Sequence, residues 1–141
     1  DKLIEKVEIY VSSVVAHEEA LFFSKSEGKV PENIDLKKLI SEGKIQEFIA
    51  TQQELDTLYC MFDNVFIHGL HLGEAESLAL ILKGEIEGTL YCSADAIAIQ
   101  ALAMIDCSDL GISFETILTK TGLKQKLRKH FTDKFFKENI L

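Results

Sequence analysis

The sequence is poor in several residue types and segment types, and each shortage excludes a class of protein. It has one proline, no tryptophan and three cysteines in 141 residues. No run of 18 apolar residues occurs, so we expect no membrane partner. It begins at Asp1 with neither a methionine nor a signal-peptide pattern, which indicates a trimmed sequence. The scattered Cys60, Cys92 and Cys107 indicate buried thiols in a reducing, cytoplasmic compartment, without a disulfide framework or zinc site.

The composition is that of an ordinary globular protein, but its charge is unevenly distributed. Hydrophobic residues make up 47% and charged residues 27%, and the length predicts a single domain over 1–141. The net charge is −8. Residues 120–141 carry seven Lys and Arg against two acids, whereas residues 1–119 carry eight against twenty-one. The acidic body argues against indiscriminate nucleic-acid binding but permits a local basic surface.

The stretch from Leu72 to Asp95 organises the rest of the chain. Residues 72–83 have apolar side chains at helical spacing, and Gly84 suits a C-terminal cap. Residues 89–93 are a short apolar run, which indicates a buried strand. Such a helix spans about 16 Å, and such a strand about 17 Å. The two lengths therefore predict that the helix start and the strand end lie at one edge of a sheet.

Acidic residues lie both at the start of this helix and at the end of this strand. Glu74 and Glu76 lie in the first turn of the helix, and Asp95 follows the strand. Ligands of open α/β sheets bind at this edge, so the acids are either an ion site or a set of coincidental helix caps. Glu18, just over one turn into a helix expected after Ser13, is placed near the same edge.

The remaining segments predict an α/β fold. Strands are expected near 7–12, 44–50, 89–93 and 111–114, and helices near 14–24, 36–42, 51–62, 72–83 and 96–105. Residues 64–72 are expected to be a connector in which His68 and His71 are loop histidines, since zinc spacing is lacking. The predicted architecture is a three-layer α/β/α sandwich with a mostly parallel sheet.

A set of short segments in this order resembles a known family. The segments are Ile-Tyr-Val-Ser-Ser-Val-Val-Ala-His-Glu, Lys-Leu-Ile-Ser-Glu-Gly-Lys-Ile, Leu-Gly-Glu-Ala-Glu-Ser-Leu-Ala-Leu, Tyr-Cys-Ser-Ala-Asp and Gly-Ile-Ser-Phe-Glu-Thr-Ile-Leu. Over residues 3–123 the chain is similar to the PIN domain (PilT N-terminus) nuclease superfamily, in its branch with a Gly-Glu-Ala-Glu helix. The resemblance implies a Mg²⁺- or Mn²⁺-dependent endoribonuclease, a hydrolase of RNA phosphodiester bonds, with many relatives acting as toxins of toxin–antitoxin pairs.

The resemblance also implies roles for particular residues. Glu18, Glu74 and Asp95 match the family's catalytic, metal-binding carboxylates, with Glu76 an additional candidate ligand. Mg²⁺ prefers such oxygen ligands and shares them with substrate phosphate.

The sequence departs from the family pattern in three places. Ala94 stands where a second aspartate is frequent, and Ile99 where arginine is frequent. The family's first strand, with its aspartate, would precede Asp1. These departures favour an alternative from another class: a degenerate, non-catalytic PIN-like module that binds RNA or a protein partner.

The C-terminal segment indicates a further element. Apolar residues recur at helical spacing through residues 123–141, which predicts an amphipathic helix with a basic face. Its apolar stripe needs another surface, so we expect a homodimer that uses this helix, with docking onto its own domain as the alternative.

Overall fold

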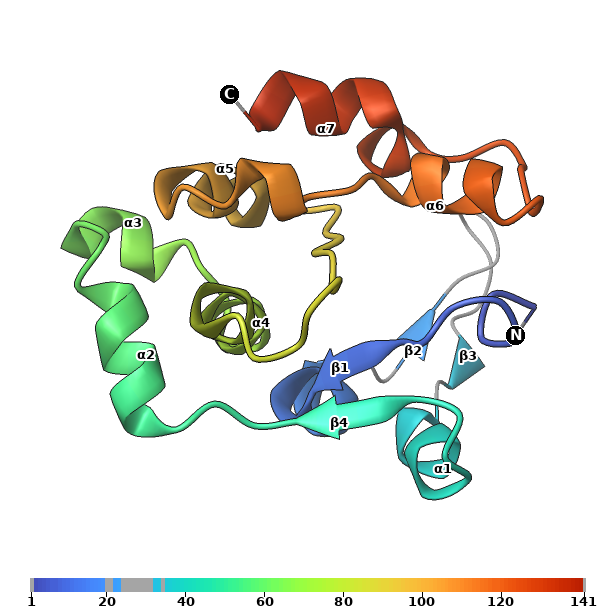
Figure 1. Ribbon diagram of the computed structural model, residues 1–141, viewed down its shortest axis with the longest axis horizontal. Coiled ribbons are helices and arrows are strands. Elements are labelled where there is room, and N and C mark those ends of the chain that lie inside the picture. The colour runs from blue at the N-terminus through green and yellow to red at the C-terminus, as the bar shows by residue number, and fades with distance from the viewer. Residues whose placement is uncertain (1, 20–21, 24–31, 34, 141) are drawn as a thin grey trace. The chain divides into compact units, whose positions relative to one another are not determined.

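The computed structural model describes residues 2–19, 22–23, 32–33 and 35–140 (Figure 1). It divides into two compact units, residues 1–49 and 50–141, which are considered separately. Helices account for 54% of the residues and strands for 7%, and the only parallel sheet described has two strands. The expectation of a three-layer α/β/α sandwich with a mostly parallel sheet is therefore wrong. Among the described helices, none has the length and apolar character needed to cross a membrane.

The first unit is built on a short parallel pair, β1 (Tyr10–Ser12) and β4 (Gln46–Phe48), in which Tyr10 is aligned with Gln46. The connection contains a π-helix (Val15–Glu19), the antiparallel pair β2 (Phe22–Phe23) and β3 (Glu32–Asn33), and α1 (Leu36–Ser41). Asp35 caps α1 by accepting a hydrogen bond from the Lys38 backbone N–H at 3.0 Å. The helix expected over 14–24 is thus a π-helix at Val15–Glu19 and is wrong at Phe22–Phe23, which form β2; residues 20–21 and 24 lie outside the described residues.

The second unit is helical. It contains α2 (Gln52–Tyr59), α3 (Asn64–His68), α4 (Leu72–Lys83), α5 (Ala96–Met104), α6 (Phe114–Lys120) and α7 (Asp133–Asn139). Two 3₁₀ turns, Ser108–Leu110 and Lys129–Phe131, lie between them. The predicted capping box opens α2: Glu54 N–H donates to Thr51 Oγ1 and Thr51 N–H to Glu54 Oε1, at 3.1 and 3.2 Å. Gly84 ends α4 with φ of 67°, a conformation that glycine adopts without strain.

The last two expected strands of the sheet meet at one point only. Tyr91 and Gly111 form an isolated parallel bridge, in which the Tyr91 N–H donates to Leu110 O at 2.7 Å and the Ile112 N–H to Tyr91 O at 2.9 Å. The pairing ends there because Ser113, two residues after Gly111, already caps α6. Within the described residues, these segments therefore give extended chain with one bridge instead of a sheet.

The core of the second unit surrounds α5. Ala98, Ile99, Ala101 and Leu102 are almost completely buried. Around them pack apolar side chains of α2, α4 and the connecting segments, among them Leu55, Leu58, Phe62, Leu70, Leu78, Ile81 and Tyr91. Cys60 is exposed, so the expectation of a buried thiol is wrong there. Cys92 is exposed as a residue, but burial raises the pKa of its thiol to about 11, and Cys107 is half-buried; all three cysteines are free.

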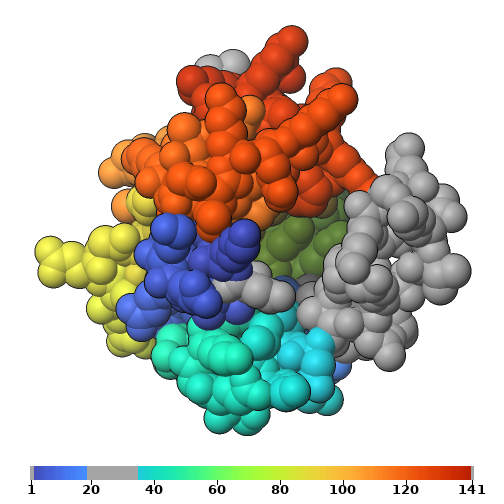
Figure 2. Space-filling view, turned by 90° about the vertical axis from the view of Figure 1, so that its right-hand side faces the viewer, coloured from blue at the N-terminus to red at the C-terminus, as the bar shows by residue number. Residues whose placement is uncertain are grey.

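The N-termini of α6 and α7 share one network of hydrogen bonds. Ser113 Oγ and Thr116 Oγ1 donate to Asp133 Oδ1 at 3.0 and 3.2 Å. In return, the Asp133 backbone N–H donates to Glu115 Oε2 at 2.7 Å. Lys137 Nζ lies 2.7 Å from Asp133 Oδ2. Each helix therefore supplies an acid to the positive end of the other, which fixes the two helices together. Figure 2 shows the surface of this segment in orange to red.

The C-terminal segment is not one helix. Residues 123–128 are non-helical, and α7 begins only after Thr132, which caps it by accepting a bond from the Phe135 N–H at 3.3 Å. The bases Lys124, Lys126, Arg128 and Lys129 lie close together without intervening acids, and their repulsion disfavours a helix there. Helix α7 packs along α5 of its own unit (Figure 1), which is the intramolecular alternative. The homodimer stays a prediction.

Gly111 permits this packing and gives a first prediction. A Cβ built at Gly111 would lie 2.7 Å from Phe136 Cζ of α7 and 2.8 Å from Leu102 Cδ2 of α5. Its backbone is extended, with φ of −85°, so alanine is tolerated by the backbone and only the space is lacking. We expect Gly111→Ala to lower the free energy of unfolding by about 1–3 kcal/mol in urea titrations, because of overpacking.

The matched test is a double variant. In a Phe136→Leu background the ring atom nearest to Gly111 is gone, so Gly111→Ala should cost less than in the parent, by about 0.5 kcal/mol or more. Equal costs in the two backgrounds would show that α7 does not pack against Gly111.

The α6–α7 network predicts a pH-dependent contribution to stability. The hydrogen bond from Lys137, assisted by those from Ser113 and Thr116, lowers the pKa of Asp133 in the folded protein. A lowered pKa means that the stabilisation is present above the unfolded-state pKa of about 3.9 and is lost as the pH falls through the lower folded value. Asp133→Asn should therefore destabilise the protein in urea at neutral pH and have little effect near about pH 2.

Glu138→Gln is the matched control, since it makes the same charge change on α7 at an exposed pair, 4.0 Å from Lys134. We expect it to change stability by less than about 0.5 kcal/mol at neutral pH. An effect of Asp133→Asn that does not change with pH would contradict the conclusion that the ionised Asp133 carboxylate stabilises the fold.

Candidate metal centre

Helix α4 begins at the candidate site, and its first turn fixes Glu74. His71 is the N-cap residue, and its backbone N–H donates to Glu74 Oε2 at 3.1 Å. This is the glutamate half of a capping box, which positions the carboxylate beside the positive end of the helix. The Glu74 side chain is only 16% exposed. The carboxylate is therefore held by local hydrogen bonding and is partly shielded from water.

Helix α5 begins at Asp95, which is the second acid of the site. Asp95 Oδ1 accepts hydrogen bonds from the backbone N–H groups of Ile97 at 2.8 Å and Ala98 at 3.3 Å. The Asp95 N–H in turn donates to Ser93 Oγ at 3.1 Å. Both of these capping hydrogen bonds use Oδ1 of Asp95. The helix start thus fixes the orientation of this carboxylate as firmly as α4 fixes Glu74.

Three residues bring ligand atoms together at the starts of these two helices. His71, Glu74 and Asp95 each place one such atom so that all three lie within 4.8 Å of one another. His71 Nδ1 lies 3.7 Å from Glu74 Oε2. Helices α4 and α5 pack against each other, which sets the separation of the two acids. One imidazole nitrogen and two carboxylate oxygens form a donor set that fits a divalent cation.

Tyr91 lies beside both acids. It is 9% exposed, and burial, followed by the negative charge of Glu74, raises its pKa; a hydrogen bond with Ser93 opposes the rise. The negative charge of Asp95 also raises it. The phenol therefore remains protonated at neutral pH and is a neutral polar neighbour of the carboxylates.

Glu76 belongs to a different part of the unit. It is 4% exposed, and its Oε2 accepts a hydrogen bond from the Ala50 backbone N–H at 2.9 Å. Two residues along a helix are about 200° apart around its axis, so Glu74 and Glu76 face opposite ways. The structure gives Glu76 a position in which it ties the segment before α2 to α4, and the cluster does not contain it.

Glu18 lies in the first unit, exposed in the π-helix Val15–Glu19. Its neighbour His17 places Nε2 2.6 Å from Glu47 Oε2 on β4, which connects the π-helix to the parallel pair. Within the second unit the structure brings together Glu74 and Asp95, whereas Glu18 belongs to the first unit. A metal-binding role for Glu18 stays a prediction.

Three residues at the site, His71, Tyr91 and Ser93, are not predicted from the sequence, although a signal for each exists. His71 was interpreted as a loop histidine, yet it precedes Glu74 by three residues, the spacing at which a helix N-cap and its capping-box glutamate meet. Tyr91 and Ser93 alternate with Asp95 at a period of two residues, which places their side chains on one side of an extended segment.

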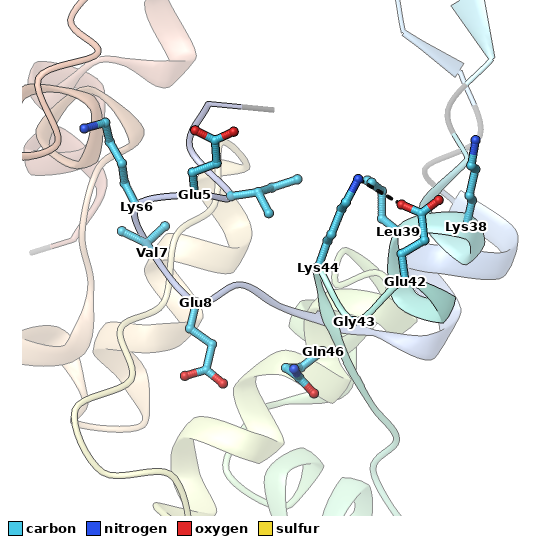
Figure 3. A pocket seen from close by; sticks show the side chains of 11 residues that line it. Glu5, Lys6, Val7, Glu8, Lys38, Leu39, Glu42, Gly43, Lys44 and Gln46 are labelled. Atoms are coloured by element: carbon cyan, nitrogen blue, oxygen red, sulfur yellow. Dashed lines mark ion pairs between the residues drawn. The ribbon is translucent and has the colours of Figure 1, made fainter.

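The first unit contains a separate depression of about 930 Å³ (Figure 3). Its charged lining residues are three glutamates and three lysines: Glu5, Lys6, Glu8, Lys38, Glu42 and Lys44. Lys44 Nζ and Glu42 Oε2 point toward each other and lie 2.9 Å apart. Because the opposite charges balance and this pair neutralises itself, the depression has no charge preference for a ligand.

Comparison with protein-family models, curated proteins and solved structures finds no match for this chain.

The position of Glu76 predicts that this acid in the first turn of α4 contributes to stability and not to metal binding. Glu76→Leu would remove the acceptor of the partly buried Ala50 N–H, and we expect it to lower the free energy of unfolding by about 1–3 kcal/mol. Glu76→Gln keeps an acceptor oxygen and should cost less. Metal titration of Glu76→Gln should match the parent, and a loss of metal affinity in this variant would return Glu76 to the site.

Proposed function

We propose that this chain is a divalent-metal-dependent endoribonuclease of the PIN type, in which Glu74 and Asp95 hold the ion. The observation that supports this is that two helix-capping carboxylates and an imidazole lie close together at the starts of α4 and α5. These are two of the three carboxylates to which the family resemblance assigns metal binding. A bound Mg²⁺ or Mn²⁺ would supply charge neutralisation at the scissile phosphate and an activated water.

The residues of this chain hold the two carboxylates in position. Glu74 and Asp95 are held by backbone N–H groups of their own helices, so the two carboxylates are preorganised at the cost of little side-chain entropy. Tyr91 remains protonated beside them and adds no further negative charge. The site therefore concentrates two negative charges, a requirement for binding a hard divalent cation.

The partners follow from the proposed reaction. RNA is the proposed substrate, and an antitoxin is the protein partner that the family resemblance implies. Three free cysteines, two of them exposed, fit a reducing compartment such as the cytoplasm.

Asp95→Asn tests the proposal without removing the helix cap, because asparagine is as good an N-cap as aspartate. We expect the 141-residue parent to bind Mn²⁺ in calorimetric titration, and a form that also carries the family's first strand with its aspartate to cleave RNA. Asp95→Asn should weaken Mn²⁺ binding and slow cleavage by about 100-fold or more, since part of the charge that holds the ion is lost.

The matched control is Asp63→Asn, at the N-cap of α3, where Asp63 Oδ1 accepts the Phe66 N–H at 2.8 Å. It makes the same chemical change at the same kind of position outside the cluster, so it should leave cleavage and Mn²⁺ affinity unchanged. It also controls for contaminating ribonuclease. If Asp95→Asn cut RNA as fast as the parent, the nuclease role would be refuted. Metal binding without cleavage by a form that carries the family's first strand would also refute it, in favour of the non-catalytic module.

A further inference from the structure

The side chain of His71 differs from its two neighbours in the cluster. It is 69% exposed, whereas the Glu74 side chain is 16% exposed, and it contributes the only nitrogen of the three ligand atoms. Its backbone N–H is held by Glu74 at 3.1 Å, so the residue is anchored while its ring remains accessible. An anchored imidazole beside two fixed carboxylates suits it to be a third metal ligand.

The separations are compatible with this role. Metal–ligand bonds of about 2.0–2.1 Å in a tetrahedral site place neighbouring ligand atoms about 3.3 Å apart. The present limit of 4.8 Å therefore requires a shift of at most about 1.5 Å. Rotation of the exposed histidine ring about its side-chain bonds can move its ligand nitrogen by such a distance relative to the two carboxylates.

The electrostatics of the helix starts favour a nitrogen ligand. The N-termini of α4 and α5 carry partial positive charge, which opposes a cation held by charge attraction alone. Mg²⁺ depends on such attraction and prefers an all-oxygen octahedral shell. A coordinate bond from a neutral imidazole adds affinity that does not depend on net charge, and it is available to transition metals.

We propose that His71 is a metal ligand and that it makes the site selective for a transition-metal dication of the Mn²⁺ to Zn²⁺ series over Mg²⁺. The inference rests on the proposed function, because it uses the same two carboxylates. It specifies the ion class of that site: three protein ligands, one nitrogen and two oxygens, with a coordination position left for water or phosphate. Mn²⁺ is the member of this class that the family resemblance also allows.

Calorimetric titration of the 141-residue chain with Zn²⁺ and, separately, with Mg²⁺ tests this inference. His71→Gln should lower the Zn²⁺ affinity about tenfold or more, while the Mg²⁺ affinity changes by less than about twofold. His68→Gln is the matched control: His68 is an exposed histidine at the end of α3 and lies outside the cluster, so it should leave both affinities unchanged.

Carboxylate variants separate a failure of this inference from a failure of the proposed function. Glu74→Gln keeps the capping-box hydrogen bond, as Glu54→Gln does at the equivalent position of α2, which is its control. If Glu74→Gln and Asp95→Asn weaken Zn²⁺ binding but His71→Gln does not, the nitrogen ligand is refuted and the carboxylate site stands. If Zn²⁺ affinity is the same in all three variants and the parent, both proposals are refuted.

Discussion

The second unit depends on the burial of a broad face of α5. Ala98, Ala101 and Leu102 have no exposed surface, so this face must be covered by other segments, whereas Gln100 and Met104 remain exposed. Helix α4 covers one side, α7 another, and two glycines let the chain approach closely elsewhere. A Cβ at Gly69 would lie 2.8 Å from Ile97 Cδ1, and one at Gly111 would lie 2.8 Å from Leu102 Cδ2. Because Asp95 caps α5, the same burial that stabilises the unit also fixes one acid of the candidate site.

The sequence predicts this helical framework well where the signals are local. The starts of α1, α2 and α5, and the glycine that ends α4, follow from capping residues within a few positions of each boundary. Strand pairing depends instead on partners far along the chain. Each expected strand contains a paired residue, Tyr10, Gln46, Tyr91 or Gly111, but the pairs form one short ladder and one bridge. Periodicity alone identifies extended chain and does not show whether a partner strand exists.

The candidate site shows the same division between local and distant information. The matched lengths of the helix 72–83 and the segment 89–93 predict that Glu74 lies near Asp95, and the two residues are near each other. The segment that leads back to Asp95 is extended chain and not a strand of a sheet. Glu74 and Glu76 do not meet at one site, because side chains two residues apart in a helix point to opposite faces. This part of the prediction could have been corrected from local helix geometry. The absence of zinc spacing along the sequence predicts a loop histidine at position 71, whereas Asp95 lies beside His71 from 24 positions away through the packing of α4 on α5.

Capping and metal binding are compatible uses of the same carboxylates, and the geometry explains why. A carboxylate has two oxygens and about four lone-pair directions. The two hydrogen bonds by which Asp95 caps α5 both engage Oδ1. A helix N-terminus with its cap in place presents an acid whose orientation has already been fixed, which reduces the entropy that an ion must overcome. The chain has other capping acids, Asp35, Glu54 and Asp63, each at a separate helix start. What distinguishes Glu74 and Asp95 is that the burial of α5 brings two helix starts to the same place. Convergence of caps, and not the presence of acids, is therefore the property that makes this site a candidate metal centre.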